Sequence, residues 1–506
     1  MQKTINKILL VIFSGVLMCL AVLGEKTWWT SLFGLIPLFI VLLKNSLEEN
    51  PKKIIKENIF ACGIFGLIFY SFSLYWLESY GWYAHIGLAV LQTLFLCIFG
   101  GLFHFFVLKS EKKSPIFQVA RFFLLTVGVG FLWTSVDFLR SLGIFGFQWY
   151  SIFHLVAYDR LLIQYISYTG PYFLDFVVVA FSMCAVYFIV KKRPKTFWEV
   201  GITEEFCAFV GVMIFIVLHI VPINFIHSPI CADYSVALLQ GSLDMWEKTD
   251  FETLDTYKKL LKKVEKADLY VLPETTFSYL NENRFITKEL ENFSKKKATP
   301  MIVGANTDSQ GEGLFNSAVL ISKYGVWQTK QNKMRLVPYG EYVPKILPVK
   351  TDDMREIDAV PGEEITTLDL AETPIKVACG ICYDSSFPKF FREASKKANV
   401  FCVISNDWWF GKGFAPENHF MMSVLRAVEN RRYLLRCGSN GISGVITPYG
   451  EPLKRTKLDE VVALTEGFGL MNEVTLYAKY GDLYPWVGLF LWVIFIPVIW
   501  FVRISN

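Results

Sequence analysis

Charged residues are scarce in this chain of 506 residues. Only 19% of the residues are Asp, Glu, Lys or Arg, whereas 53% are hydrophobic and the mean hydropathy is +0.37. An ordinary soluble protein carries about 25% charged residues. The composition therefore excludes such a protein and favours one that is largely embedded in a membrane.

An excess of one charge sign is also missing, as are internal repeats and low-complexity tracts. The chain has 50 Lys and Arg against 46 Asp and Glu, a net charge of +4. The basic residues are scattered over short loops, so no nucleic-acid partner is expected.

The ten cysteines lack the spacing of a disulfide framework. Five lie in apolar runs, where a thiol is usually a small buried hydrophobe: Cys19, Cys62, Cys97, Cys184 and Cys207. The others are an odd number: Cys231, Cys379, Cys382, Cys402 and Cys437. At least one thiol is therefore expected to be free.

Eight apolar stretches are long enough for a helix across ~30 Å of hydrocarbon. They lie at residues 7–24, 27–43, 58–77, 84–108, 121–141, 161–190, 206–225 and 485–503. Between the last two is a region of normal polarity that is long enough for one domain. We therefore expect a seven-helix transmembrane domain at 1–228, a catalytic domain at 229–472, and a linker with the eighth transmembrane helix at 473–506.

The positions of Lys and Arg predict the orientation in the membrane. They concentrate at the N-terminus (Lys3), in the second, fourth and sixth connections (Lys44, Lys109 and Lys191 among others) and after the last helix (Arg503). Since cytoplasmic segments are rich in Lys and Arg, both termini are expected to be cytoplasmic and the large domain to be exported.

The first stretch also permits an interpretation as a signal peptide. Cys19 follows Val16-Leu17-Met18, a poor signal for lipid attachment, and no small-x-small cleavage site precedes Glu25. These features favour a retained helix.

Four charged residues lie within or beside the apolar runs: Glu78, Asp137, Arg140 and Asp175. Intramembrane charges are costly and often functional. The i, i+3 spacing of Asp137 and Arg140 is equally typical of a structural ion pair.

The large domain alternates short apolar strands with helical segments. The expected strands are 234–240, 269–272, 301–305, 317–321, 375–379, 400–404 and 444–446, and the expected helices are 254–267 and 420–435. This alternation predicts an α/β layered domain.

Three short segments place a reactive side chain directly after an apolar strand. They are Val271-Leu272-Pro273-Glu274-Thr275, the segment from Asn332 to Glu341, and Gly380-Ile381-Cys382-Tyr383-Asp384. Ends of strands are where α/β folds assemble their sites. Taken alone, Glu274 or Lys333 is a weak signal, because most such residues are solvated surface groups.

In this order and spacing, the three segments resemble the carbon-nitrogen hydrolase (nitrilase) superfamily. The whole chain is similar to the membrane-embedded branch of that superfamily, the apolipoprotein N-acyltransferases. The resemblance extends over Val403 to Gly411, His419-Phe420, Arg426-Ala427 with Glu429, Leu435-Arg436 and Asn440-Gly441. It implies an α-β-β-α sandwich on the exported side of a bacterial inner membrane.

The resemblance also implies roles for single residues. Cys382 would be the nucleophile, Glu274 the general base, Lys333 the cation beside the oxyanion, and Glu341 a supporting carboxylate. A carboxylate can take the thiol proton, and an ammonium lowers the pKa of a neighbouring thiol and stabilises an oxyanion.

Contacts to the substrate are implied for Trp246, Trp149, Tyr383, Asp384 and Trp409, although Trp246 and Trp409 could equally serve packing. The chain departs from the family pattern at two places. Asp384 replaces a Glu, and Gln148 stands where a proline is common.

The Cys379-x-x-Cys382 spacing permits two rivals, a thioredoxin-like redox pair and half of a zinc site. A redox pair should open a helix, whereas Cys379 ends a strand. A second ligand pair is missing from the sequence, and His419 has no partner at ligand spacing. Cys379 is therefore expected to be a buried filler, and no metal or cofactor is expected.

The implied reaction moves an acyl chain from a membrane phospholipid to Cys382, and then to the N-terminal amine of a diacylglyceryl apolipoprotein. Three alternatives stay open: a membrane-tethered amidase, a transporter with an accessory domain, and a binding protein with an inactive hydrolase fold. An inactive binding protein should have lost one of the three residues Glu274, Lys333 and Cys382, and this chain has all three.

Overall fold

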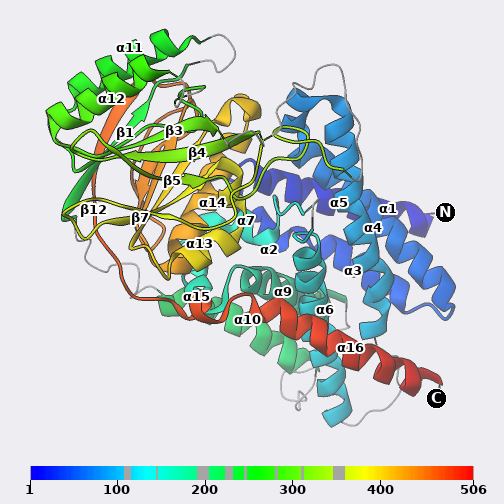
Figure 1. Ribbon diagram of the computed structural model, residues 1–506. Coiled ribbons are helices and arrows are strands. Elements are labelled where there is room, and N and C mark those ends of the chain that lie inside the picture. Colours follow the sequence, from blue (N-terminus) through cyan, green and yellow to red (C-terminus); the bar gives the residue numbers. More distant parts are fainter. Residues whose placement is uncertain are drawn as a thin grey trace. The chain divides into compact units, whose positions relative to one another are not determined.

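The computed structural model describes residues 2–107, 115–143, 146–190, 204–222, 232–243, 248–278, 280, 283–308, 313–345 and 359–504. The chain divides into two compact units, Met1–Ile226 with Asp482–Asn506, and His227–Gly481. The first is helical and the second is built on two sheets (Figure 1).

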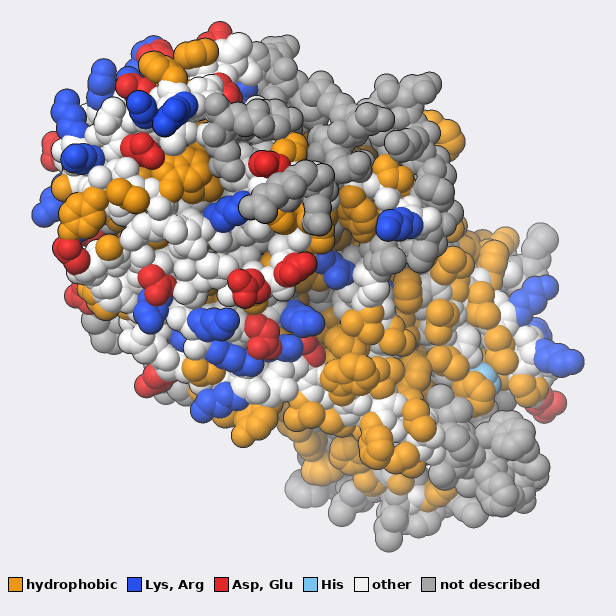
Figure 2. Space-filling view, in the orientation of Figure 1, with side chains coloured by type: hydrophobic (Ala, Val, Ile, Leu, Met, Phe, Trp, Pro, Cys, Tyr) orange, Lys and Arg blue, Asp and Glu red, His pale blue; other side chains and the backbone are white. Residues whose placement is uncertain are grey.

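The helical unit contains long apolar helices joined by short turns. Its helices are α1 (Gln2–Val22), α2 (Thr30–Gly34), α3 (Ile36–Ser46), α4 (Pro51–Ser73), α5 (Trp82–Phe103), α6 (Pro115–Leu139), α7 (Ile152–Leu155), α8 (Ile166–Thr169), α9 (Tyr172–Val190), α10 (Glu204–Ile220) and α16 (Leu483–Ile504). Hydrophobic side chains gather over this unit, whereas the surface of the other unit carries many charges (Figure 2).

Among the described residues, five helices are long and apolar enough to cross a membrane. They are Thr4–Val22, Pro51–Ser73, Trp82–Phe106, Phe117–Leu139 and Tyr172–Val190. Apolar helices at Thr30–Ser46, Phe206–Ile220 and Leu483–Ile494 are shorter. The composition and these helices make the chain a membrane protein, and the count of eight spans stays a prediction.

Two of the expected helices differ from the prediction in detail. The stretch 27–43 is interrupted at Leu35, because Pro37 lies in the first turn of α3 and has no N–H to continue a helix from α2. The stretch 161–190 becomes a long helix only at Tyr172, after short turns that end at Gly170 with φ +82°. Hydropathy alone does not register either interruption.

Asp137 and Arg140 form the structural ion pair that their spacing permits. Arg140 Nε lies 2.6 Å from Asp137 Oδ1, and its other nitrogens donate to Gln92 Oε1 at 2.9 Å and Ser151 Oγ at 2.7 Å. Asp175 accepts from the backbone N–H of Phe153 at 2.8 Å. These buried bonds tie the segment after α6 to α5, α6 and α9.

The second unit contains two six-stranded sheets. In spatial order, the first sheet is β12 (Val462–Phe468), β1 (Tyr234–Gln240), β2 (Leu269–Val271), β3 (Met301–Asp308), β4 (Leu314–Ile321) and β5 (Trp327–Asn332). The second is β11 (Pro452–Arg455), β10 (Gly444–Ile446), β9 (Leu434–Gly438), β8 (Val400–Ser405), β7 (Lys376–Ile381) and β6 (Thr367–Asp369).

Alternation along the strands decides which side chains fill which layer. In β1, Val236 and Leu238 belong to the core between the sheets, whereas Ala237 and Leu239 pack with the helices outside. The helices α11 (Asp250–Lys263) and α12 (Arg284–Lys297) cover the first sheet. The helices α13 (Pro388–Ala394) and α14 (Ala415–Asn430) lie against the second, and α15 (Leu476–Tyr480) follows β12. The unit is therefore an α-β-β-α sandwich.

All seven strands expected from the sequence are present, and two of them, 234–240 and 444–446, have the expected bounds. The helix expected at 420–435 is wrong at its end. Helix α14 stops before Arg431, which has φ +49°, and Leu434 and Leu435 belong to β9. A run that is buried on all sides has no periodicity to separate helix from strand.

Candidate active site

The directions of the strands explain why three distant segments meet. Strands β2 and β3 are parallel, β4 is antiparallel to β3, and β5 is antiparallel to β4, so β5 runs in the direction of β2. In the other sheet β7, β8 and β9 are parallel. Glu274 follows β2, Lys333 follows β5 and Cys382 follows β7.

Lys333 is held between two carboxylates. Its Nζ lies 3.0 Å from Glu274 Oε1 and 2.9 Å from Glu341 Oε1. Burial disfavours the ammonium, but the two carboxylates outweigh that effect and raise the pKa of Lys333 well above its usual value. The side chain is therefore a permanent cation.

Asn316, a residue of β4 that the sequence did not single out, joins the same two glutamates. Its Nδ2 donates to Glu274 Oε1 at 2.7 Å and to Glu341 Oε1 at 3.1 Å. Strand β4 lies between β3 and β5 in the sheet. One amide can thus orient both carboxylates relative to Lys333.

The other oxygen of Glu274 is also fixed. Oε2 accepts the backbone N–H of Asn406, which follows β8 of the opposite sheet, at 2.7 Å. The chain around Glu274 passes very close to β3, because a Cβ on Gly304 would lie 2.0 Å from the Pro273 carbonyl oxygen. A glycine at position 304 is therefore required for this approach.

Cys382 occupies a strained turn directly after β7. Its φ is +47°, in the left-handed region that non-glycine residues rarely adopt, and a short 3-10 helix, Cys382–Ser386, begins there. A sharp turn between strand and helix directs a nucleophile out of the sheet. The residue is 7% exposed.

The electrostatics of Cys382 differ from the expectation. Burial and the Glu274 charge raise the pKa of the thiol, and Lys333 offsets this only in part. Lys333 lowers the pKa of the thiol as expected, but burial has the larger effect. The thiol keeps its proton at rest, and a base is needed to remove it.

Asp384 ties the turn of Cys382 to the segment of Lys333. Its carboxylate accepts the backbone N–H groups of Ile381 at 3.0 Å, Met334 at 3.4 Å and Arg335 at 2.7 Å. Burial raises the pKa of Asp384 to about 6, against the opposing effect of these hydrogen bonds. The shorter side chain thus reaches backbone on both segments.

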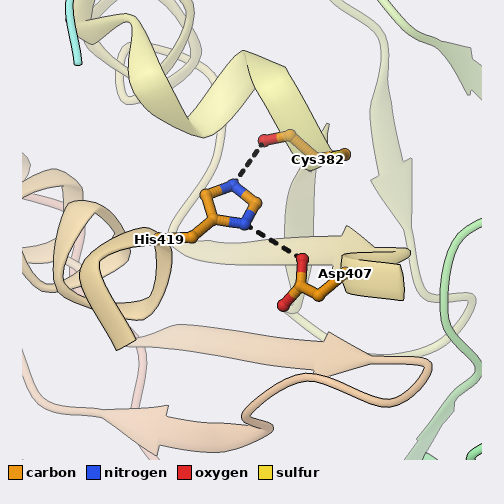
Figure 3. Close-up of side chains that lie close together, drawn as sticks. All are labelled: Cys382, Asp407 and His419. Carbon is orange, nitrogen blue, oxygen red and sulfur yellow. Dashed lines mark hydrogen bonds and ion pairs between the residues drawn. The ribbon is translucent and has the colours of Figure 1, made fainter. Parts of the chain in front are cut away.

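Cys382, Asp407 and His419 lie close together, with ligand atoms within 4.8 Å of one another (Figure 3). Cys382 and Asp407 follow strands β7 and β8, whereas His419 belongs to helix α14, so the sequence spacing does not reveal them as neighbours of His419. His419 Nε2 faces the Cys382 carbonyl oxygen at 3.3 Å rather than the sulfur, and Nδ1 lies 3.0 Å from Asp407 Oδ1.

Arg436 joins Asp407 and His419 in a hydrogen-bonded cluster. Its Nη2 lies 2.9 Å from His419 Nδ1 and 3.1 Å from Asp407 Oδ2, so a guanidinium occupies the place from which a cation would approach. Burial and Arg436 lower the pKa of His419. A neutral imidazole has one N–H, so His419 Nδ1 either donates to Asp407 Oδ1 or accepts from Arg436. Its Nε2 lies 2.9 Å from Ser385 Oγ and 3.3 Å from the Cys382 carbonyl oxygen.

The remaining expected residues are spread over the two units. Tyr383 is 8% exposed beside Cys382, and Trp409 is partly buried after β8. Trp149 is 1% exposed in the helical unit, where its ring centroid lies 4.9 Å from that of Trp76. Trp246 lies outside the described residues.

Cys379 is fully buried between the sheets, as expected of a filler. Its neighbour in the parallel register is Cys402 of β8 rather than Cys382, and both cysteines of the Cys379-x-x-Cys382 motif are free. The arrangement does not support a thioredoxin-like pair, which opens a helix.

The fold and these strand-end residues define a carbon-nitrogen hydrolase, and the corresponding family model, Carbon-nitrogen hydrolase, matches residues 235–464. A second model, Apolipoprotein N-acyltransferase N-terminal domain, matches residues 14–184. The chain belongs to the apolipoprotein N-acyltransferase family, and the resemblance stated from the sequence is confirmed.

Relatives with that name match nearly the whole chain. An apolipoprotein N-acyltransferase of Geobacter metallireducens is 28% identical over 94% of this chain and 92% of its own length. The relative of that name from Borreliella burgdorferi is 26% identical over 93% of this chain and 91% of its own length. The relative from Rickettsia prowazekii is 27% identical over 73% of this chain and 74% of its own length.

Proposed function

We propose that this protein is an N-acyltransferase of lipoprotein maturation that moves an acyl chain from a phospholipid, through a thioester on Cys382, to the N-terminal amine of a diacylglyceryl-cysteine protein. The observation that supports this most is the placement of Lys333 between Glu274 and Glu341, with the charges of Glu274 and Lys333 both acting on the Cys382 thiol.

In the first half-reaction, Glu274 takes the proton of the Cys382 thiol and the sulfur attacks the ester carbonyl of the donor. A C–S bond forms, and the carbonyl oxygen becomes an oxyanion beside the Lys333 ammonium. Collapse breaks the C–O bond. The leaving alkoxide takes the proton from Glu274 and departs as a lysophospholipid.

In the second half-reaction, the α-amine of the acceptor attacks the thioester carbonyl and a C–N bond forms. Glu274 accepts the amine proton, and the Cys382 sulfur leaves and is reprotonated. The product is an amide. Water would hydrolyse the thioester, and the deep burial of Cys382, Lys333 and Glu274 opposes its access.

We also propose the arrangement in the membrane. The chain has eight spans, with the seven-helix domain at 1–228, the catalytic domain at 229–472 on the periplasmic side of a bacterial inner membrane, and the linker and last span at 473–506. The Lys and Arg pattern supports cytoplasmic termini. Both lipid substrates then meet the site at the membrane surface.

The test follows a labelled acyl chain of a phospholipid onto the protein. Wild-type protein should carry a label that hydroxylamine removes, and the variant Cys382→Ala should carry none. Cys379→Ala is the matched control and should be labelled normally. Label that persists on Cys382→Ala would refute the proposal, and release of free fatty acid without amide product would favour the amidase.

A further inference from the structure

Ser405, the last residue of β8, lies beside the nucleophile and has no part in the acyl-transfer steps above. Strands β7 and β8 are parallel neighbours, and Ile381 pairs with Ile404 in their register. Cys382 and Ser405 each follow one member of that pair, so the two residues leave the sheet side by side. The Ser405 side chain is fully buried.

The hydroxyl of Ser405 is bonded to Asp407 next to the sulfur of Cys382. Ser405 Oγ donates to Asp407 Oδ1 at 2.5 Å. A carboxylate oxygen of Asp407 and the Cys382 sulfur lie within 4.8 Å of each other (Figure 3). Burial and the Glu274 charge raise the pKa of the Cys382 thiol, whereas a hydrogen bond with the Ser405 side chain lowers it. The hydroxyl therefore has two acceptors within reach, a carboxylate and the reacting sulfur.

Asp407 stays charged and fixed whichever acceptor the hydroxyl chooses. Burial opposes the charge, but Arg436 and the other groups around the carboxylate outweigh burial, and the pKa of Asp407 lies below its usual value. Its Oδ2 accepts from Arg436 Nη2 at 3.1 Å. A Cβ on Gly441 would collide with the same oxygen, so the loop after β9 packs directly on the carboxylate. Asp407 thus keeps a cation as partner when the hydroxyl turns away.

A serine hydroxyl has one proton and can rotate to suit its acceptor. While the Cys382 sulfur is protonated it is a weak acceptor, so the hydroxyl donates to the carboxylate of Asp407. Once Glu274 has taken the thiol proton, the sulfur is charged. Hydrogen bonds to charged acceptors are the stronger ones, so the balance between the two acceptors then shifts toward the sulfur.

We propose that Ser405 is a further catalytic residue, whose hydroxyl donates to the Cys382 sulfur whenever the sulfur is negatively charged, and that Asp407 positions this hydroxyl. In the first half-reaction the hydroxyl rotates from Asp407 to the thiolate as Glu274 takes the proton, and no bond within Ser405 breaks. In the second, the C–S bond breaks, the sulfur keeps the electron pair, and Ser405 donates to it until Glu274 returns a proton. The inference rests on the proposed function and adds a donor for the sulfur, whereas Lys333 serves the oxyanion.

The test measures the sulfur directly in the full-length protein in detergent. Alkylation of Cys382 by iodoacetamide, followed by mass spectrometry, needs no lipid substrate. Ser405→Ala should lower its rate at pH 8 about three- to tenfold. Loss of a hydrogen bond to a charged group reduces the thiolate fraction about ten- to hundredfold, and the higher nucleophilicity of the remaining thiolate recovers about half of this on a logarithmic scale. Formation of the labelled thioester should slow by a similar factor.

A matched control removes another buried hydroxyl of the same unit. Ser443 directly precedes β10 of the second sheet, and its Oγ donates to Gln240 Oε1 at 2.6 Å. Ser443→Ala should leave the alkylation rate and the thioester rate unchanged.

A second pair of variants separates the hydroxyl from its packing. Ser405→Thr and Ser405→Val have nearly the same shape and suit a strand, and only the threonine has a hydroxyl. Ser405→Thr should keep a rate of alkylation close to that of wild type, and Ser405→Val should match Ser405→Ala. This comparison holds even if Ser405→Ala does not fold.

Equal rates of alkylation for Ser405→Thr and Ser405→Val would overturn the inference. So would a slower thioester step in Ser405→Ala with unchanged alkylation, because the hydroxyl would then act elsewhere than on the sulfur. Wild-type protein that forms no thioester would instead refute the proposed function, whereas the alkylation rates would still show whether Ser405 acts on the sulfur.

Discussion

The Nζ of Lys333 lies 3.0 Å from Oε1 of Glu274, although 58 residues separate them and two strands, β3 and β4, lie between β2 and β5 in the sheet. The ammonium offsets the negative charge of the carboxylate that is to act as the base. The same ammonium charge lowers the pKa of the Cys382 thiol.

Replacing Lys333 by Met should slow thioester formation about 10²- to 10³-fold, the loss typical for one oxyanion donor. The variant also leaves Glu274 and Glu341 without their cation. Lys330→Met is the control, because Lys330 belongs to the same segment and donates to Thr307 Oγ1 instead. Rapid quenching of the labelled acyl-enzyme measures both rates, and equal effects of the two substitutions would contradict the assignment.

Asn316→Leu should slow thioester formation about tenfold or more. The substitution removes the hydrogen bonds to Glu274 and Glu341, each typically contributing about 1.5–3 kcal/mol when the acceptor is charged. Asn306→Leu is the control on the paired position of β3. A normal rate for Asn316→Leu in a folded protein would show that Lys333 alone positions the carboxylates.

The raised pKa of Cys382 predicts how its alkylation depends on pH. Since burial and Glu274 keep the thiol protonated at neutral pH, the rate with iodoacetamide should keep rising with pH up to about pH 9, above the usual thiol pKa. Mass spectrometry of the peptide that contains Cys382 measures the rate. A plateau near pH 7 would indicate a preformed thiolate and contradict this electrostatic account.

Asp384 should make stability depend on pH between about 4 and 6. Its pKa is raised from 3.8 to about 6 in the folded protein, so its contribution to stability is full below pH 4 and is lost as the pH rises through 6. The loss amounts to about 3 kcal/mol at 1.36 kcal/mol per pKa unit.

The comparison of wild type with Asp384→Asn tests this, because the variant cannot titrate there. The melting temperature of the detergent-solubilised wild type should fall relative to that of Asp384→Asn as the pH rises from 4 to 7. A constant difference across that range would refute the shift.

In the helical unit, Arg140→Met should lower the free energy of unfolding by about 3–5 kcal/mol, because it leaves Asp137 as a buried charge without its cation. Lys53→Met is the control, since its ion pair with Glu48 is exposed and should contribute little to stability. Thermal unfolding in detergent compares them, and equal losses would show that burial of the Asp137–Arg140 pair has no energetic consequence.

Local patterns in the sequence were sufficient for the strands that precede Glu274 and Cys382. Apolar runs followed closely by these two residues reflect a short-range rule, that a buried strand ends where a polar side chain appears. Such patterns did not predict β9, because this strand follows closely after helix α14 and both are buried. They also placed no strand at β5 or β12, where burial is partial.

By itself, the sequence determined that the chain is a membrane protein with one α/β domain, because total hydrophobicity and the length of apolar runs are local properties. Only the tertiary structure decided that Asn316 joins both glutamates, that Asp384 reaches the Lys333 segment and that His419 faces the Cys382 carbonyl. These contacts depend on strand direction and on the packing of two sheets. The residues next to each of these positions in the sequence determine neither the strand direction nor the packing of the sheets.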